Sequence, residues 1–392
     1  MSDLPILASL QACTGCMACI DICPKHALKP RMHEDGHFYV TLNQDNCIKC
    51  LKCEKVCKDS RSNYGCNDLS LSTPYAAWAR KKEYRKAGTS GGVFAAIAEW
   101  ILSEGGIVIG AKLNTNSCSH TVISHIEDIQ SLQGSKYMQS NTEGIYRQIA
   151  AHLKNRKVLF TGLGCQVSAV IAFFNTHPHK ENLYTADLVC GGVPSSLLIN
   201  QYIINNPNIE KISSFRTKSV YELKGWINAK EVCLKNRPLP LYGFFFGMTN
   251  RYSCSNCQHA FTHRKSDFTL GDLWQDEDFP NEHENGISLL ICHNEKAKHI
   301  MLASDIEYSE TKWEKVLPAN QRIANGKRKI YWQRKYISSL FKLLSYRQIN
   351  KLYALSIKPY DLIWFAYKVI LYTKLKLEKR QSTQLIKKIL EQ

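Results

Sequence analysis

Apolar residues from residue 85 onward follow two alternating patterns. The run VFAAIAEWIL (93–102) places apolar side chains at helical spacing, and IVIGA (107–111) is a short continuous apolar stretch typical of a buried strand. The same alternation predicts further helices at 129–132, 144–154 and 167–174, and further strands at 120–126, 157–162 and 183–192. Strand, glycine turn and helix in series indicate an α/β domain with a largely parallel or mixed sheet.

A second set of elements follows Ser195. It comprises a helix and then strands at 212–216, 226–234 and 286–292. Ligands of α/β sheets bind outside the carboxyl ends of the strands, and here those ends carry Cys165 and Cys190. Cys254 and Cys257 form a C-x2-C pair on one turn. Buried core cysteines and a metal site both fit these four positions, and the C-x2-C pair favours the metal.

The N-terminal stretch repeats four cysteines at one spacing. The pattern C-x2-C-x2-C-x3-C occurs twice, 34 residues apart. Three cysteines at x2 spacing reach three corners of one 4Fe-4S cube, and in two-cluster ferredoxins the fourth cysteine of each run crosses to the other cube. The spacing therefore predicts two sets of ligands. The first cysteine group is Cys13, Cys16, Cys19 and Cys57, and the second cysteine group is Cys23, Cys47, Cys50 and Cys53.

Zinc is the alternative for these cysteines, because paired C-x2-C runs also bind it. The spacing and Pro24 favour iron–sulfur clusters over zinc and over a disulfide framework. Residues 37–42 alternate like a strand after the turn signal at 34–36, which predicts a hairpin between the two halves. This part resembles bacterial-type ferredoxin domains, except that Lys58 stands where a second proline often follows the last cysteine.

Length and composition fit a globular chain of two to three domains. The sequence has 392 residues, of which 44% are hydrophobic, so it is neither disordered nor membranous as a whole. The first residues lack a basic start and a long apolar run, so we expect no secretory signal. Sixteen cysteines without an export signal are expected to be ligands in a reducing cytoplasm.

The net charge of +17 is concentrated in the C-terminal tail. Residues 322–392 hold 17 Lys and Arg against three acids, a surplus of 14, so the preceding residues carry only +3. The tail is expected to form helices at 336–344 and 360–380, and the apolar run in the second is too short to span a membrane. An amphipathic helix on an anionic membrane, a helix docked on a partner and a solvated tail all fit. Nucleic acid fits poorly, because no folded recognition motif accompanies the charge.

The segment Thr89-Ser90-Gly91-Gly92 precedes the helix predicted at 93–102. A Ser or Thr cap and two glycines leave backbone N–H groups open to an anion at the positive end of the helix dipole. A plain capped loop is equally compatible with these residues. Cys66 stands alone between the N-terminal cysteines and this loop, and we expect it to be inert.

Several segments in a fixed order carry a more specific resemblance. They are SGGVFAAIA, GSKYMQS, TGLGCQ, DLVCGGVPS, RYSCSNC and RKSDFTLGDLW, following the double ferredoxin pattern. Together they resemble the coenzyme F420 hydrogenase/dehydrogenase beta subunit family over roughly residues 8–320. The resemblance implies an α+β and α/β chain, with a bacterial-type ferredoxin domain, a mixed-sheet α/β flavin-binding body and a basic helical tail.

The expected domain layout follows from this resemblance. It comprises a two-cluster 4Fe-4S ferredoxin domain at 1–60, a connector at 61–84, an FAD-binding N-terminal α/β domain at 85–175, the family's C-terminal domain at 176–320 and the basic helical tail at 321–392.

Members of that family are iron–sulfur flavoproteins that contain FAD. The resemblance implies a further 4Fe-4S cluster on the third cysteine group, which is Cys165, Cys190, Cys254 and Cys257. It also implies a group of FAD-pocket residues, here called the flavin-side residues: Ser90, Gly91, Gly92, Lys136, Tyr137, Ser140 and Gln166. The family usually has Pro where this chain has Gly164, and His where it has Gly191, and the second difference removes a candidate proton donor near the flavin.

Lys136, Arg264 and Asp267 are the candidate catalytic residues. Lys136 could stabilise an anionic reduced flavin or bind a phosphate. The alternative is that Lys136 is a solvated surface lysine. Arg251 and Asp272 are further candidates on the substrate side, and Asp272 fits a turn cap equally well.

The sequence supports two hypotheses of function. In the first, the chain is a cytoplasmic oxidoreductase that passes electrons from its ferredoxin clusters through FAD to a small organic substrate. Its expected partner is an electron donor or acceptor protein such as ferredoxin, and its relatives suggest a setting in polysaccharide biosynthesis, with the tail on the inner face of the membrane. In the second, it is a non-catalytic electron-transfer subunit that docks on a larger redox complex.

Overall fold

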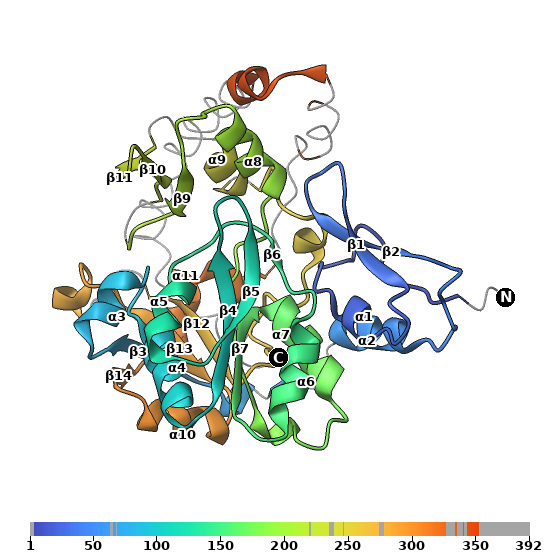
Figure 1. Ribbon diagram of the computed structural model, residues 1–392. Helices are drawn as coiled ribbons and strands as arrows, with labels where there is room; N and C mark the ends of the chain where they lie inside the picture. Colours follow the sequence, from blue (N-terminus) through green and yellow to red (C-terminus); the bar gives the residue numbers. More distant parts are fainter. Residues whose placement is uncertain are drawn as a thin grey trace.

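The computed structural model places most of the chain. It describes residues 4–62, 66–67, 69–218, 221–234, 239–245, 247–273, 278–326, 334, 340 and 343–352. A small N-terminal module, blue in Figure 1, lies beside a large central sheet, and a second, smaller sheet lies beyond the other end of the body.

The N-terminal module is a hairpin packed on two short helices. Its elements are α1 (Ala18–Asp21), β1 (Leu28–Met32), β2 (Phe38–Leu42) and α2 (Lys52–Ser60). The strands pair antiparallel with Leu28 opposite Leu42, which confirms the predicted hairpin. Helix α1 packs on α6 (Ile145–Leu153), and α2 packs on α7 (Gly164–Phe174), so the module rests directly on the body (Figure 1).

Within the described residues, nine strands form the central sheet in the order β14-β3-β13-β12-β8-β7-β4-β5-β6. Their bounds are β3 (Thr73–Ala79), β4 (Ile107–Leu113), β5 (Cys118–Ile123), β6 (Ser140–Asn141), β7 (Val158–Leu163), β8 (Leu183–Leu188), β12 (Phe268–Asp272), β13 (Ser288–Cys292) and β14 (Ile306–Glu310). The run β12-β8-β7-β4 is parallel, and the strands flanking it pair antiparallel. The predicted mixed α/β sheet is therefore confirmed.

Helices cover the central sheet and bury its apolar side chains. The largest apolar cluster joins α4 (Val93–Ser103) and α10 (Glu295–Ala303) to β3, β4, β13 and their neighbours. A second cluster joins α6 and α7 to the N-terminal module, which explains why that module sits firmly on this face. The remaining helices of the body are α3 (Lys82–Ala87), α5 (Ile129–Leu132), α11 (Trp313–Ala319) and α12 (Gln321–Ala324).

A smaller antiparallel sheet in the order β11-β10-β9 lies outside the central one. It contains β9 (Lys211–Ser214), β10 (Lys224–Ile227) and β11 (Lys230–Cys233), next to α8 (Ser196–Ile204) and α9 (Leu239–Phe245). The prediction of one strand over 226–234 is wrong in this region. Asn228 and Ala229 adopt positive φ and form a two-residue hairpin turn between β10 and β11.

Two further predictions need correction. Residues 73–79 lie within the stretch expected to be a connector at 61–84, but they form strand β3 inside the central sheet. The apolar run begins at Pro74 and does not end there. The strand predicted at 183–192 ends at Leu188, so Cys190 lies in the following loop.

The basic tail lies mostly outside the described residues. The helix predicted at 360–380 falls there entirely, and so does most of the one at 336–344. Among the helices that the structure describes, none combines the length and apolarity that crossing a membrane requires.

Candidate functional site

The two N-terminal cysteine loops share an unusual backbone. Gly15 and Met17 have φ of 72° and 60°, and the equivalent Lys49 and Leu51 have φ of 56° and 57°. Positive φ is uncommon for residues other than glycine. Its recurrence at matching positions of the sequence repeat shows that both loops curl in the same way around their cysteines.

The first cysteine group comes together in space. The pKa of the Cys16 thiol is raised to about 11, chiefly by burial, with smaller increases from the neighbouring Cys13 and Cys57. Burial also raises the pKa of Cys19 well above its ordinary value. Cys16, Cys57 and Cys13 contribute smaller increases to this pKa, in that order. Cys57 therefore faces the first loop although it is 38 residues or more away from it in the sequence. Such crowded thiols lose their protons readily only when a metal supplies positive charge.

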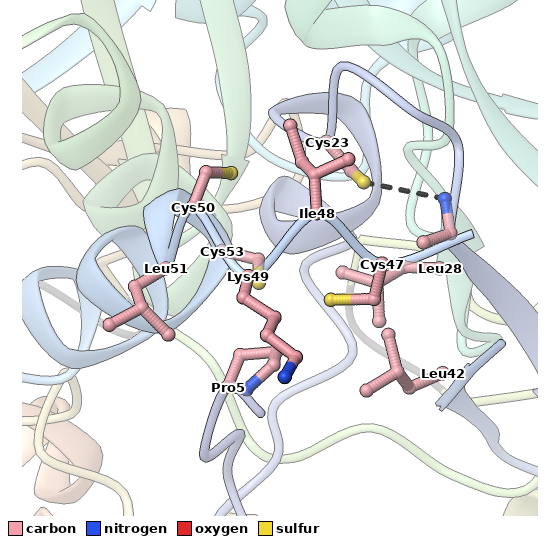
Figure 2. Close-up of a pocket in the computed structure, with 11 residues that line it drawn as sticks. Pro5, Cys23, Leu28, Leu42, Cys47, Ile48, Lys49, Cys50, Leu51 and Cys53 are labelled. Atoms are coloured by element: carbon pink, nitrogen blue, oxygen red, sulfur yellow. Dashed lines mark hydrogen bonds between the residues drawn. The ribbon is translucent and has the colours of Figure 1, made fainter. Parts of the chain in front are cut away.

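The second cysteine group lines one open cavity (Figure 2). Cys23, Cys47, Cys50 and Cys53 share its wall with Leu28 and Leu42 of the hairpin. The space between its lining residues is about 310 Å³, open solvent included. The Cys23 Sγ accepts a hydrogen bond from the Ala27 N–H at 3.3 Å. Four thiols thus line one open site, and a backbone donor already points at the sulfur of Cys23.

The third cysteine group also converges. Cys165 lies in the first turn of α7, Cys190 follows β8, and Cys254 and Cys257 lie in and just after the 3-10 helix Tyr252–Asn256. Burial raises the pKa of Cys165 well above its ordinary value, and Cys257, Cys190, Cys254 and Cys16 raise it further in that order. Because Cys16 belongs to the first group, the first and third groups are neighbours.

Backbone donors point at the sulfurs of the third group. The Gly192 N–H donates to Cys190 Sγ at 3.3 Å, and the Val193 N–H donates to Cys254 Sγ at 3.4 Å. Among the described residues, no three His, Cys, Asp or Glu side chains converge closely enough to hold one metal ion. The distinction between a cluster and zinc therefore depends on the comparison with known proteins below.

Arg251 lies between the first and third groups. It is 1% exposed, and its Nε and Nη2 donate to Cys13 O at 2.6 Å and to Cys13 Sγ at 3.4 Å. Nη2 also donates to Phe38 O at 2.7 Å, and the guanidinium lies 4.2 Å from the centre of the Tyr39 ring. Burial is the main cause that raises the pKa of Cys254, to about 12, and Arg251 acts in the opposite direction and lowers it. Arg251 is thus a buried cation shared by two cysteine groups, and not a residue open to a substrate.

We expect Arg251→Leu to lower the midpoint potential of the cluster on the first cysteine group by about 60–130 mV. The variant removes a charged hydrogen bond to sulfur worth roughly 1.5–3 kcal/mol, and for one electron 59 mV corresponds to a tenfold change. A redox titration followed by electron paramagnetic resonance measures the shift. Arg31→Leu is the control, because Arg31 is exposed on β1. An equal shift in both variants would contradict a specific role for Arg251.

The body holds the first cysteine loop by direct hydrogen bonds. Thr142 Oγ1 and Tyr146 OH both donate to Cys16 O, at 2.8 and 2.5 Å. The Asp21 carboxylate at the end of α1 accepts from the N–H groups of Gly144 and Tyr146 at 2.8 and 3.0 Å. These bonds fix the N-terminal module at the start of α6 and keep the first group next to the third.

The predicted ligand sets, in which the fourth cysteine of each run binds the other run's cube, determine what pairs of cysteine substitutions should do. Cys13→Ala with Cys57→Ala should damage one cube, so iron should fall from roughly twelve to roughly eight per chain. Cys13→Ala with Cys23→Ala should damage two cubes and leave roughly four. Iron analysis after anaerobic purification distinguishes the pairs, and the reverse order would mean that each run binds its own cube.

The Ser90 loop is packed tightly against the central sheet. Ser90 Oγ donates to Ile287 O at 2.9 Å, and the Gly91 N–H donates to Ser288 Oγ at 2.9 Å. A Cβ on Gly91 would lie 2.6 Å from Ala77 O, and Gly92 has φ of 80°. The two glycines are thus required by close packing and backbone shape, and the Gly91 N–H expected to be open to an anion already has a partner.

The other flavin-side residues lie on a neighbouring loop and on α7. Thr89 Oγ1 and Ser135 Oγ are 2.9 Å apart, so the Ser90 loop and the loop carrying Lys136 and Tyr137 touch. Lys136 Nζ donates to Leu132 O and Gln133 O at 2.6 and 2.8 Å, and burial lowers its pKa to about 8. It is not the solvated surface lysine of the alternative interpretation.

Ser140 hydrogen-bonds a histidine that sequence reasoning missed, and Gln166 lies close to the same ring by way of Gly162. A Cβ on Gly162 would lie 3.0 Å from Gln166 Oε1 and 3.2 Å from His120 Nε2. His120 Nδ1 lies 2.8 Å from Ser140 Oγ, and His120 Nε2 lies 3.0 Å from Thr161 O. Gln166 Oε1 accepts the Leu163 N–H at 2.9 Å. Burial lowers the pKa of His120 to about 4, so this ring is neutral at physiological pH. A lone histidine inside a strand gives no local signal that could have identified it.

Two buried cations near the Ser90 loop were also missed. Arg216 forms a two-pronged ion pair with Asp272, at 2.8 and 2.6 Å, and donates to Thr89 O at 2.7 Å. Lys218 Nζ donates to Ser90 O at 2.9 Å, and burial, followed by Arg85 and Arg216, lowers its pKa to about 8. Asp272 is therefore the partner of Arg216 and not a turn cap.

The other two candidate catalytic residues lie on the far side of β8. Asp267 accepts from Thr185 N and Oγ1 at 2.8 and 2.9 Å, and from Asn294 Nδ2 at 2.9 Å, so its carboxylate ties β12 to β8 and α10. Arg264 is 3% exposed and pairs with the buried Asp187 at 3.0 Å. The structure does not bring either residue together with Lys136.

Comparison with known proteins identifies the N-terminal module first. Residues 12–60 match the model of the 4Fe-4S dicluster domain, so the chain is an iron–sulfur protein of a redox class and the zinc alternative is not favoured. Residues 74–145 and 155–314 match the N- and C-terminal parts of the coenzyme F420 hydrogenase/dehydrogenase beta subunit. These two matches together span more than half of the sequence. The chain belongs to the coenzyme F420 hydrogenase/dehydrogenase beta subunit family.

Among solved structures, a similar chain occurs in the xenon-derivatised F420-reducing NiFe hydrogenase complex from Methanosarcina barkeri. The two chains are 18% identical, the match covers 67% of this chain and 90% of that one, and the TM-score is 0.48. No curated protein matches the sequence.

Proposed function

We propose that the chain is an iron–sulfur flavoprotein oxidoreductase, in which a relay of three 4Fe-4S clusters connects a one-electron partner to FAD and an organic substrate. The observation that carries this proposal is the proximity of the first and third cysteine groups, since Cys16 is near enough to raise the pKa of Cys165. Two groups packed this closely suit the passage of single electrons from the N-terminal module into the body.

The second cysteine group is the proposed point of electron entry. Cys50 is exposed, and beside it Ile48 and Leu51 are 54% and 45% exposed. Exposed apolar residues around a redox centre suit a transient partner, such as a ferredoxin, that must come close without binding tightly. The order second group, first group, third group then runs from the surface to the interior.

The flavin-side residues are proposed to hold FAD. The half-buried Lys136 and Lys218 and the buried Arg216 suit its phosphates, and Tyr137, stacked on Phe244 with ring centres 4.3 Å apart, suits an aromatic ring system. The flavin, when bound, exchanges two electrons with a substrate and one at a time with clusters. The protein itself supplies neutral His120 near Ser140 and a lysine of lowered pKa, which can hold or release a proton at neutral pH.

Anaerobic purification with counts of iron, sulfide and flavin tests this proposal. We expect roughly twelve iron and about one releasable flavin per chain. The purified protein should also oxidise a chemical reductant with a small acceptor unaided. Iron near twelve without flavin, and without such activity, would instead support the second candidate, a non-catalytic electron-transfer subunit of a larger complex. The dicluster domain favours that candidate equally.

We also propose a setting for the reaction. A glycan precursor is the proposed substrate class, and the basic tail is proposed to contact an anionic membrane surface from the cytoplasm. Liposome flotation of the full chain against a chain ending at Ala319 tests the tail, and equal flotation would remove the membrane contact.

A further inference from the structure

The second cysteine group lies on a face of the N-terminal module that exposes several apolar side chains. Ile6, Ile48 and Leu51 are 70%, 54% and 45% exposed, and Cys50 is exposed between the last two. Figure 2 shows Ile48 and Leu51 on the loop that carries these cysteines. Ile6 lies nearby, because its N–H donates to Glu54 Oε2 on α2 at 2.8 Å and the residue before it lines the cavity of the second group. Exposed apolar side chains gathered on one face mark a site of protein contact.

The charged side chains closest in sequence to this group are mainly lysines. Within two positions of one of its cysteines stand four exposed lysines, which are Lys25, Lys49, Lys52 and Lys55. The acids at this separation are Asp21, Asp45 and Glu54. Asp21 is 6% exposed and accepts two N–H groups from the body, and Glu54 pairs with Lys58. Of the three acids, Asp45 is therefore the one that offsets the lysines at the surface.

The remaining acids of the module do not reverse this balance. Asp35 is 2% exposed and pairs with Arg334. Asp59 is half-buried and near Lys265, whose pKa it raises against the larger effect of burial. Glu34 lies in the hairpin turn, where two exposed cations of β1 outnumber it. The surface around the second cysteine group is therefore cationic.

Three of the four lysines are not explained by contacts within the chain. Lys49 lines the cavity of the second group, where a 4Fe-4S cube with four thiolates would add negative charge. Lys25, Lys52 and Lys55 have no acidic partner within the residues that the structure describes. Lys52 and Lys55 also stand in the first turn of α2, whose N-cap makes no side-chain hydrogen bond, and a cation there opposes the helix dipole. Charge kept at an unfavourable place, without a partner inside the chain, suits a partner outside it.

We propose that this face docks an acidic one-electron carrier protein. The docking face has an apolar centre and a cationic rim, formed by Ile6, Ile48 and Leu51 and by Lys25, Lys52 and Lys55. Apolar contacts at the centre exclude water, while the rim charges steer an oppositely charged partner and set its orientation. The exposed Cys50 at the centre favours a partner with a redox centre of its own over a lipid surface.

One electron crosses the docking face in each encounter. The carrier gives up one electron to the cube of the second group, so the carrier is oxidised as the cube is reduced, with no bond made or broken and no proton required. The carrier must then leave before the next one arrives, which suits a small interface steered by charge. The proposal rests on the proposed function for the place of electron entry, and it adds the charge and the class of the partner.

Stopped-flow mixing of the anaerobic holoprotein with a reduced acidic 2Fe-2S ferredoxin tests the docking face. The test variant carries Lys25→Gln, Lys52→Gln and Lys55→Gln. The control variant loses the same charge on the other side of the body (Figure 1), through Lys82→Gln, Lys86→Gln and Lys230→Gln, at exposed positions of α3 and β11. At an ionic strength of about 0.01 M, the second-order rate of ferredoxin oxidation should fall about tenfold or more in the test variant and less than about twofold in the control variant.

Salt should separate charge steering from other effects. Raising the ionic strength to about 1 M shortens the screening length from about 30 Å to about 3 Å, so the wild-type rate should approach that of the test variant. A basic cytochrome c offered to the reduced holoprotein should behave in the opposite way, with salt speeding its reduction. Ile6→Gln should weaken binding of the oxidised ferredoxin roughly threefold at every ionic strength, because it removes apolar contact and no charge.

Several results would overturn the proposal. They are equal rates in wild type and test variant at low ionic strength, an equal loss in the control variant, and a wild-type rate that salt does not change. Loss of iron in the test variant would mean that the lysines serve the cube, and loss of its flotation with anionic vesicles at an unchanged ferredoxin rate would assign the face to a membrane. Counts of iron and flavin in the wild type decide the proposed function separately, so a failure of docking with these counts intact leaves that function standing.

Discussion

Cys165→Ala is expected to remove one whole cluster and to disconnect the N-terminal module from the flavin. Iron should fall from roughly twelve to roughly eight per chain, because a cube that loses one of four thiolates in a crowded buried site is not retained. The two clusters of the N-terminal module should still be reduced by a ferredoxin or by dithionite. Reduction of the flavin by ferredoxin should fall to background, since the proposed relay passes electrons from the group of Cys16 to the group of Cys165.

Cys292→Ala is the matched control for that variant. Cys292 is fully buried in the core, but its thiol contacts Met301 Sδ at 3.7 Å and belongs to none of the cysteine groups. It should keep all its iron and its flavin reduction, at the cost of a small cavity in the core. Retention of about twelve iron by Cys165→Ala would remove the third cluster from the proposed relay.

Arg334→Ala is expected to destabilise the protein by about 3–5 kcal/mol, the range for removing one partner of a buried ion pair. Arg334 is 1% exposed, and its Nη2 donates to Asp35 Oδ2 of the N-terminal module at 2.6 Å. Its Nε donates to Asn250 O at 2.7 Å, and its guanidinium lies 4.1 Å from the centre of the Tyr252 ring. One side chain from beyond residue 330 thus joins the hairpin turn to the loop that carries Cys254.

Chemical denaturation of the anaerobic holoprotein measures this loss. Arg80→Ala is the control, because Arg80 pairs with Asp305 and Glu307 on the surface, where an ion pair is worth about 0–1 kcal/mol. Similar losses in the two variants would show that the buried pair does not hold the module in place.

The effect of Arg334 should depend on pH in one direction. Burial raises the pKa of Asp35, but His37 and Arg334 outweigh it, so the pKa of Asp35 in the folded protein lies below its ordinary value of 3.8. A carboxyl whose pKa is lowered by folding stabilises the protein above that ordinary value and loses this contribution as pH falls through the folded value. The difference in stability between wild type and Arg334→Ala should therefore be constant near neutral pH and shrink below about pH 4.

The sequence alone determined the chemistry of the N-terminal module. Three thiols at x2 spacing on one loop are close because covalent geometry keeps them close, so Cys13, Cys16 and Cys19 could be grouped without a structure. The repeat also indicated the crossed partner Cys57, because two-cluster modules follow one plan. Helical and strand periods in the body likewise predicted a mixed α/β sheet, since each period depends only on residues near in sequence.

Tertiary structure decided how these parts are connected. The proximity of Cys16 to Cys165, the position of Arg251 between two cysteine groups and the bond from Arg334 to Asp35 connect residues more than 140 positions apart. It also placed β3 inside the central sheet and paired Arg264 with the buried Asp187. Local periodicity and spacing carry no information about such contacts, because burial and charge pairing between distant segments are fixed only when the whole chain packs.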